Sequence, residues 1–372
     1  LALAFLKLPV LQELLLLVNK VVLSIEAATN EGTRLVFGFV GGGPAPYAIT
    51  AAQYNMVLAF RALPIVIVFA ALSALLWHWR VIPLLVLGFA RLLGRTLGLS
   101  GAVSVGSAAS VFVGMVESPL LIKPYLARMS RHELFVLMSC GMATVAGTVM
   151  GLYAGILASV LPQALSHILV ASLLSAPAAI MLAAIMVPAE TDATAAAIDM
   201  SSPYQSSMDA LVTGTGEGVK LFGNIIAMLI VFVALVFLAD QVLGLIPTSG
   251  APLSLIGLAG KALAPLAYLL GIPWSEAQYA GELLATKVFI NELVAYLQLA
   301  ASEPGQLSAH SQLILTYALC GFANFGSLGI MLGGLTALCP QRRLDIMQLA
   351  PRSIWSGLLA TCMTGALVGL VA

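Results

Sequence analysis

GAVSVGSAASVFVGMVESPLLIKPYLARM, residues 101–129, is the stretch of this chain that decides its fold. It is apolar or small for most of its length, but it carries Glu117, with Gly114 before the acid and Pro119 after it. Proline suits the first turn of a helix and not its interior. A helix is therefore predicted to end near Gly114 and a new one to begin near Glu117. This pattern indicates a helical hairpin that dips into an apolar medium, rather than a single span.

A second stretch has the same character. Residues 275–299, SEAQYAGELLATKVFINELVAYLQL, carry Glu292 inside an apolar run, beside Asn291, which can cap a new helix. An ionised carboxylate in lipid is costly, so Glu117 and Glu292 are predicted to face a cavity or a partner. A structural pair of Glu292 with Lys287 is the alternative, although five residues is a poor spacing on a helix, where three or four is favoured.

The segments that follow these two stretches match each other. CGMATVAG at 140–147 and CGFANFGS at 320–327 share C-G-x-A at identical spacing. A hairpin with a central acid and then a glycine-interrupted span therefore occurs twice, which predicts an internal repeat. Transporters with such repeats bind their ligands where the broken helices meet. Asn324 and Ser327 share a helix face there, where they could contact a ligand or bond neighbouring helices.

The composition indicates that much of the protein's surface is in contact with lipid. Charged residues make up 9% of the chain and hydrophobic residues 60%, whereas soluble domains carry about 25% charge. The net charge is zero and no basic tract suggests a nucleic acid partner. Six apolar stretches are predicted to span the membrane: Met56–Trp79, Leu134–Leu161, Ile168–Val187, Leu221–Leu238, Leu313–Leu338 and Ile354–Val371.

Three charged and apolar segments read as amphipathic helices that lie in the membrane interface or pack on the bundle: Leu8–Ala28, Val81–Leu99 and Leu253–Leu270. Pro188–Asp209 reads as a polar loop. Cysteines without CxxC spacing and histidines without HExxH spacing give no metal-ligand pattern. The chain is therefore not expected to be an enzyme, while a passive channel remains an alternative to a transporter.

Several long motifs resemble the concentrative nucleoside transporter family, from about Glu26 to the C-terminus. They are NEGTRLVFG at 30–38, GMVESP at 114–119, LLIKPYL at 120–126, GMATVAGT at 141–148, TKVFINELVAYL at 286–297 and ALCGFANFGSLGI at 318–330. The resemblance implies an all-α integral membrane protein with two re-entrant hairpins, an inverted repeat and interfacial helices. It implies a homotrimer in the inner or plasma membrane, whose transport domain moves like an elevator. The family has eight spans, so the chain as given is expected to lack the first and part of the second.

The resemblance also implies a nucleoside site. The tip of the first hairpin, Met115, Val116 and Glu117, would contact the base. The family usually has Gln and Thr at the first two of these positions, so base preference does not carry over. Glu292, Asn324 and Ser327 would contact the ribose, and Phe322 and Val149 would pack on the ligand. The chemistry agrees, because a carboxylate accepts charge-assisted hydrogen bonds from vicinal hydroxyls.

A sodium ion is the coupling ion that the resemblance implies, and no other cofactor is expected. Its ligands would be the side chains of Ser110 and Thr144 and the backbone carbonyls of Val113 and Val145. The family usually has Asn at the position of Ser110, and a hydroxyl reaches less far, so a weaker sodium site is expected. Proton coupling through Glu117 or Glu292 is the alternative, since a carboxyl in an apolar site can take up a proton.

The expected domain order alternates between a scaffold and a transport domain. Residues 1–100 form scaffold, 101–162 the first transport repeat, 163–250 scaffold spans and a loop, 251–339 an interfacial helix with the second transport repeat, and 340–372 a C-terminal span.

Overall fold

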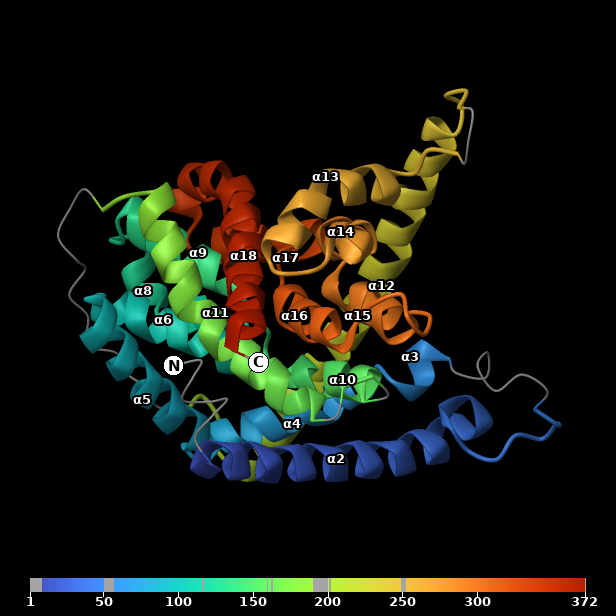
Figure 1. The fold of residues 1–372 in the computed structure, drawn as a ribbon. Coiled ribbons are helices and arrows are strands. Elements are labelled where there is room, and N and C mark those ends of the chain that lie inside the picture. The colour runs from blue at the N-terminus through green and yellow to red at the C-terminus, as the bar shows by residue number, and fades with distance from the viewer. Residues whose placement is uncertain are drawn as a thin grey trace.

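The computed structural model describes residues 9–49, 57–115, 117–158, 160–161, 163–189, 200, 202–248 and 252–371. Within these ranges the regular structure is helical, with no strand. Figure 1 shows the helices within residues 101–143 of the first repeat on one side of α18 (Arg343–Val371), and the helices of the second repeat on the other. The all-α class that the resemblance implies is confirmed.

The first hairpin breaks where the sequence predicts. Helix α6 (Gly101–Phe112) is followed by Gly114, whose φ of +115° is one that L side chains rarely adopt. Short helices α7 (Glu117–Leu121) and α8 (Lys123–Leu126) form the returning arm. Glycine at the turn and proline in the first turn of α7 therefore fix the hairpin tip.

The span after this hairpin is broken. Helix α9 (Arg131–Ala143) starts with a capping box between Ser130 and Glu133. It ends at Thr144, whose backbone is extended, and α10 (Gly147–Leu157) begins three residues later. The unwound residues 144–146 leave backbone groups free of the helix ladder in the middle of the protein.

The second repeat has the same order of elements. Helix α14 (Trp274–Phe289) leads to α15 (Glu292–Ala300), which is capped by the Asn291 side chain on the Val294 amide at 3.0 Å, as predicted. Helices α16 (Ala309–Leu319) and α17 (Phe325–Leu338) replace the continuous span predicted over Leu313–Leu338. The chain is unwound at 320–324, and the Asn324 side chain caps the start of α17.

Five helical segments of the described residues are long and apolar enough to cross a membrane, against six predicted: Leu58–His78, Arg131–Leu157, Ala164–Met186, Ser207–Leu243 and Pro340–Val371. The first comprises α3 (Leu58–Arg61) and α4 (Ile65–His78). The others include α11 (Ala164–Met186), α12 (Ser207–Leu243), the 3-10 turn η3 (Pro340–Arg342) and α18 (Arg343–Val371). The loop was predicted over Pro188–Asp209. Because the Ser206 side chain caps α12, the helix begins at Ser207 and Asp209 lies in its first turn.

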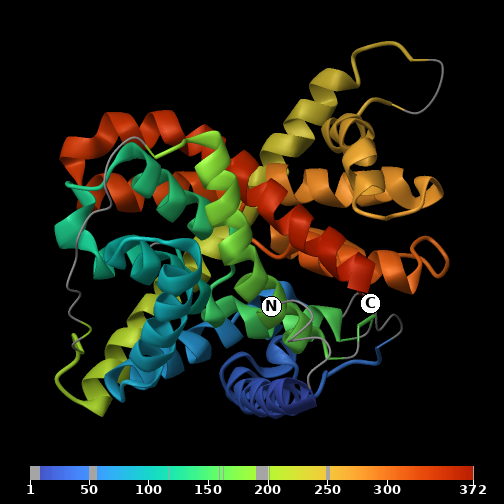
Figure 2. The ribbon, with the colours of Figure 1, turned by 60° about the vertical axis from the view of Figure 1, so that its left-hand side comes forward.

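Three helices with charged residues frame the spans. Helix α2 (Pro9–Phe37), followed by η1 (Gly38–Gly41), lies along one edge of the molecule, and Figure 2 views it nearly along its axis. Helices α5 (Val81–Leu97) and α13 (Leu255–Leu269) complete the set. Arg91 and Arg95 of α5 are exposed. This placement agrees with the amphipathic pattern of the sequence.

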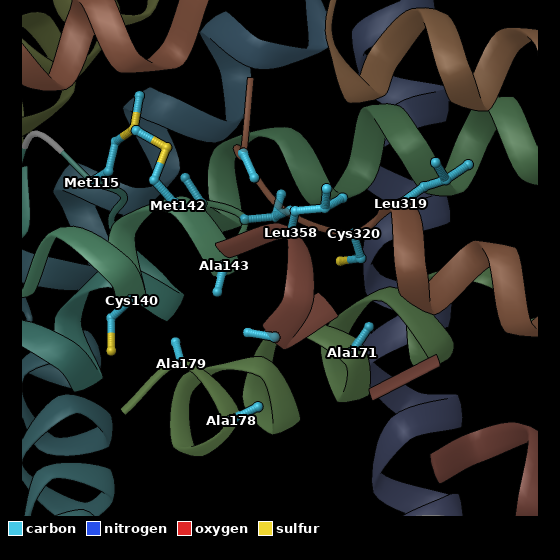
Figure 3. Close-up of a cluster of buried hydrophobic side chains, with 14 of the residues drawn as sticks. Met115, Cys140, Met142, Ala143, Ala171, Ala178, Ala179, Leu319, Cys320 and Leu358 are labelled. Atoms are coloured by element: carbon cyan, nitrogen blue, oxygen red, sulfur yellow. The ribbon is translucent and has the colours of Figure 1, made fainter. Parts of the chain in front are cut away.

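The two repeats meet around α11 and α18. Helix α11 packs on α9, α18 packs on both α9 and α16, and the two helices pack on each other. Figure 3 shows Ala143 of α9, Leu319 and Cys320 at the end of α16, and Ala171 of α11 gathered in one buried cluster. Packing therefore associates α11 and α18 with the repeats, although the sequence-based domain order placed them outside.

Helix α12 packs differently from the other spans. It contacts α4 through Gly214 and Gly218, whose backbones lie so close to α4 that an added Cβ would come within 3 Å of it. Small residues permit this close approach of membrane helices. Beyond that contact the helix is mostly exposed, with apolar side chains such as Ile230 and Phe237 pointing outward.

Candidate functional site

A cavity lies where both hairpin tips, both helix breaks and α12 meet. The space open to the centres of water molecules measures about 140 Å³, roughly ten times what a single water needs. The predicted residues that line it are Val113, Met115, Glu117, Val149, Glu292, Phe322, Asn324 and Ser327. Val116 lies outside the described residues. The fold thus brings together residues from positions 113 to 327 of the chain.

Glu292 is the buried acid of this cavity. It is the first residue of α15 and 4% exposed, so its carboxylate sits at the positive end of a helix. Its Oε1 accepts a hydrogen bond from the Tyr153 hydroxyl at 2.5 Å, and its Oε2 accepts from Asn324 Nδ2 at 2.8 Å. A carboxylate has about four acceptor positions. The two protein bonds therefore fix the carboxylate and leave capacity for donors of a ligand.

Asn324 connects the second helix break to this acid. Its Oδ1 accepts a hydrogen bond from the Ser327 backbone amide at 2.6 Å, while its Nδ2 donates to Glu292. The two alternatives for Asn324, ligand contact and bonding between elements, are therefore not exclusive, because one amide hydrogen remains for a ligand. Ser327 is nearly buried in the first turn of α17, at the cavity wall.

The tip of the first hairpin supplies a different surface. Met115 is 9% exposed and packs against Gly141, where an added Cβ would lie 2.9 Å from the Met115 Cβ. Glu117 is exposed at the cavity and its Oε2 folds back toward Gly114. Glu117 and Glu292 therefore both face the cavity, as predicted, but Glu117 is the more exposed of the two, as the first residue of the short helix α7.

Two contributions to the cavity were missed by sequence reasoning. Tyr153 lies one turn after Val149 on α10 and holds Glu292 in place. Helix α12 supplies a wall that includes Asn224, Met228 and Phe232. A single polar residue in the apolar run of α12, Asn224, was the signal available for that wall.

The four predicted sodium ligands lie at the breaks of the first repeat. Ser110, near the end of α6, accepts a hydrogen bond from the Thr144 hydroxyl at 3.2 Å, and both side chains are buried. Val113 caps α6 and Val145 lies in the unwound segment of the broken span. The Val145 carbonyl accepts from the Ser172 hydroxyl at 3.3 Å, which leaves it a second lone pair. Oxygen donors at helix ends suit a small hard cation.

The arrangement can bind a ligand that is apolar on one side and rich in hydroxyls on the other. Val149, Met228 and Phe232 offer an apolar surface, whereas Glu292 and Asn324 offer one charged acceptor and one donor. No cluster of three or more metal-ligating His, Cys, Asp or Glu side chains exists in the described part of the chain. The fold and this cavity define a membrane transporter built from two repeats that meet at a ligand site.

Comparison with known proteins agrees with this class. Residues 167–369 match the family model described as "Na+ dependent nucleoside transporter C-terminus", and residues 59–160 match the model "Nucleoside recognition". The chain belongs to the concentrative nucleoside transporter family. The resemblance found in the sequence motifs is therefore confirmed.

The relatives extend over most of the chain. An uncharacterized transporter, YutK, of Bacillus subtilis is 36% identical over 95% of this chain and 85% of its own length. Nucleoside permease NupC of Helicobacter pylori is 35% identical over 91% and 81%. Sodium/nucleoside cotransporter 1 of Rattus norvegicus is 34% identical over 92% of this chain and 53% of its own length.

Solved structures share the fold. The structure of CNTnw in an inward-facing substrate-bound state has a TM-score of 0.88 and 32% identity, and covers 99% of this chain and 89% of that one. A double variant of CNTnw in an outward-facing state has a TM-score of 0.89 and 32% identity over 99% of this chain and 87% of that one.

Proposed function

We propose that this protein imports nucleosides such as uridine against their concentration gradient, with sodium as the coupling ion. The observation that carries the proposal is the group around Glu292, a buried carboxylate held by Tyr153 and Asn324 at the wall of an otherwise largely apolar cavity. The vicinal hydroxyls of a ribose would donate to the free positions of the carboxylate. The base would pack against Met115, Val149 and Phe322.

Sodium is favoured as the coupling ion by the oxygens that gather at the first repeat. Ser110 and Thr144 place two hydroxyls 3.2 Å apart, and Val113 and Val145 carry the carbonyls beside them. Val113 also lines the ligand cavity. The cation and the nucleoside would therefore share the tip of the first hairpin, which gives a physical basis for coupling their binding. A sodium/nucleoside cotransporter among the relatives supports the same choice.

An elevator movement of the repeats against a scaffold fits the packing. The repeats, residues 101–162 and 251–339, would move together with α11 and α18, because those helices pack on α9 and α16. Helix α12, with residues 1–100, would stay in place. Its exposed apolar face would contact lipid and the other subunits of a homotrimer in the inner or plasma membrane.

Uptake by purified protein in liposomes tests the proposal. We expect radiolabelled uridine to accumulate inside above its outside concentration when an inward sodium gradient is imposed, and not when choline replaces sodium. The same vesicles with a proton gradient and no sodium test the proton alternative. Uptake that follows the proton gradient and ignores sodium would reject the sodium site, and equilibration without accumulation would identify a passive channel.

A further inference from the structure

The second repeat contains a buried lysine at the position where the first repeat carries Ser110. Ser110 lies two residues before Phe112, the last residue of α6, and Lys287 lies two residues before Phe289, the last residue of α14. Helix α6 packs on α9, and α14 packs on α16. Both side chains are fully buried. The repeat thus places a neutral hydroxyl and an ammonium group in equivalent positions.

The Lys287 ammonium is bound by oxygens of the kind that a metal cation would use. Its Nζ donates to the Ala318 carbonyl at 2.8 Å and to the Thr361 hydroxyl oxygen at 2.7 Å. Ala318 lies in the last turn of α16, where carbonyls have no partner within the helix and the helix end is partly negative. Glu292, in contrast, bonds to Tyr153 and Asn324. The Lys287 ammonium therefore occupies the position of a bound cation at the C-terminal end of α16.

The spans that follow the two repeats reinforce this correspondence. In the first repeat, Ser172 of α11 bonds to both the amide and the carbonyl of Val145 at the helix break. In the second, Thr361 of α18 supplies a hydroxyl to Lys287. Three residues further along each span, Ser175 and Thr364 contact each other at 3.3 Å. Equivalent residues that touch are expected where two repeats are related by an approximate two-fold axis.

We infer that the Lys287 ammonium is a covalently attached cation that fills, in the second repeat, the position where the first repeat takes its coupling sodium. The second repeat then has no site for an ion, and one sodium accompanies each nucleoside. This inference rests on the proposed function, because the sodium site at Ser110 and Thr144 is itself a proposal.

Removal of the lysine should turn its position into a sodium site. In Lys287→Ser the Ala318 carbonyl and the Thr361 hydroxyl lose their donor and, with the new hydroxyl, resemble the oxygens of the first repeat. The matched control is Lys220→Ser, which removes an exposed lysine paired with Glu217. The measurement is the thermal midpoint of the purified full chain as sodium chloride replaces choline chloride at constant ionic strength.

We expect Lys287→Ser in choline to unfold more than about 5 °C below the wild type, because buried polar groups have lost their partner. Sodium should restore at least half of that loss, beyond its effect on the wild type, whereas Lys220→Ser should follow the wild type in both salts. An unchanged midpoint in choline, or a sodium effect no larger than that of the wild type, overturns the inference. If Lys287→Ser does not fold, Lys287→Ala, which also leaves both oxygens without a donor, is tested against the same criteria.

A second measurement needs no variant. The ratio of charge to uridine carried into wild-type proteoliposomes should be one, and a ratio of two would overturn the inference. The failure of the proposed function is distinguishable from both results. Wild-type uptake that ignores sodium would reject the sodium coupling, while a sodium-dependent recovery of Lys287→Ser would still show that the lysine occupies a cation position.

Discussion

The substitution Glu292→Gln tests the role of the negative charge in the candidate site, because it removes that charge while the shape of the site is kept. The substitution keeps the size of the side chain, and the amide oxygen can still accept from Asn324, which now bonds the carboxylate at 2.8 Å. The new amide group can donate to the Tyr153 oxygen, whose hydroxyl now donates to Glu292. The local structure should therefore survive, and the main loss should be the negative charge offered to the ligand.

The size of the loss follows from the two ribose hydroxyls assigned to this carboxylate. A hydrogen bond to a charged group contributes about 1.5–3 kcal/mol and a neutral one about 0.5–1.5 kcal/mol. The difference is about 1–1.5 kcal/mol for each bond, and so about 2–3 kcal/mol for two. Uridine affinity should fall roughly 30- to 150-fold, which lies within the range known for truncating a buried charge.

Calorimetric titration of the purified protein with uridine, in sodium, measures this effect. Light scattering coupled to size-exclusion chromatography checks that the assembly is the same in both proteins. Glu303→Gln is the control, because it removes one acid from an exposed position outside the cavity. Binding of uridine to Glu292→Gln with wild-type affinity would refute the assignment of Glu292 to the ribose.

Three further predictions test other parts of the site and fold. A 3′-deoxynucleoside should bind roughly ten- to hundredfold more weakly than its parent, since one hydroxyl bond to a charged group is lost; equal inhibition of uridine uptake would contradict this. Ser110→Asn should lower the sodium concentration for half-maximal uptake by about fivefold, equivalent to about 1 kcal/mol from a longer-reaching ligand; an unchanged sodium curve would place the ion elsewhere. Gly218→Val should lower stability by about 1–3 kcal/mol, because its Cβ would lie 2.7 Å from the Ile67 Cα. Gly216→Val on the same helix meets nothing within 4 Å, and equal thermal midpoints of the two variants would argue against the contact.

The local features of the site were predictable because each is specified by residues close together in the sequence. Gly114 and Pro119 mark the first hairpin tip, and Asn291 marks the start of α15. The exposure of Glu117 and the contact of Tyr153 with Glu292 were not predictable, because they depend on residues far apart in the chain. Hydropathy likewise located part of α12 but neither its full length nor the side that faces the cavity.

The contribution of α12 to the cavity has a consequence for small-molecule blockers. Asn224, Met228 and Phe232 line the cavity but belong to a helix outside both repeats. Under the proposed elevator mechanism, a nucleoside must leave these side chains as it travels with Glu292. A compound that keeps the ribose but carries a bulky group packed against Phe232 would bind the two repeats and α12 at the same time, and so prevent the repeats from moving. Analogues extended in that direction should therefore be inhibitors that are not carried across the membrane.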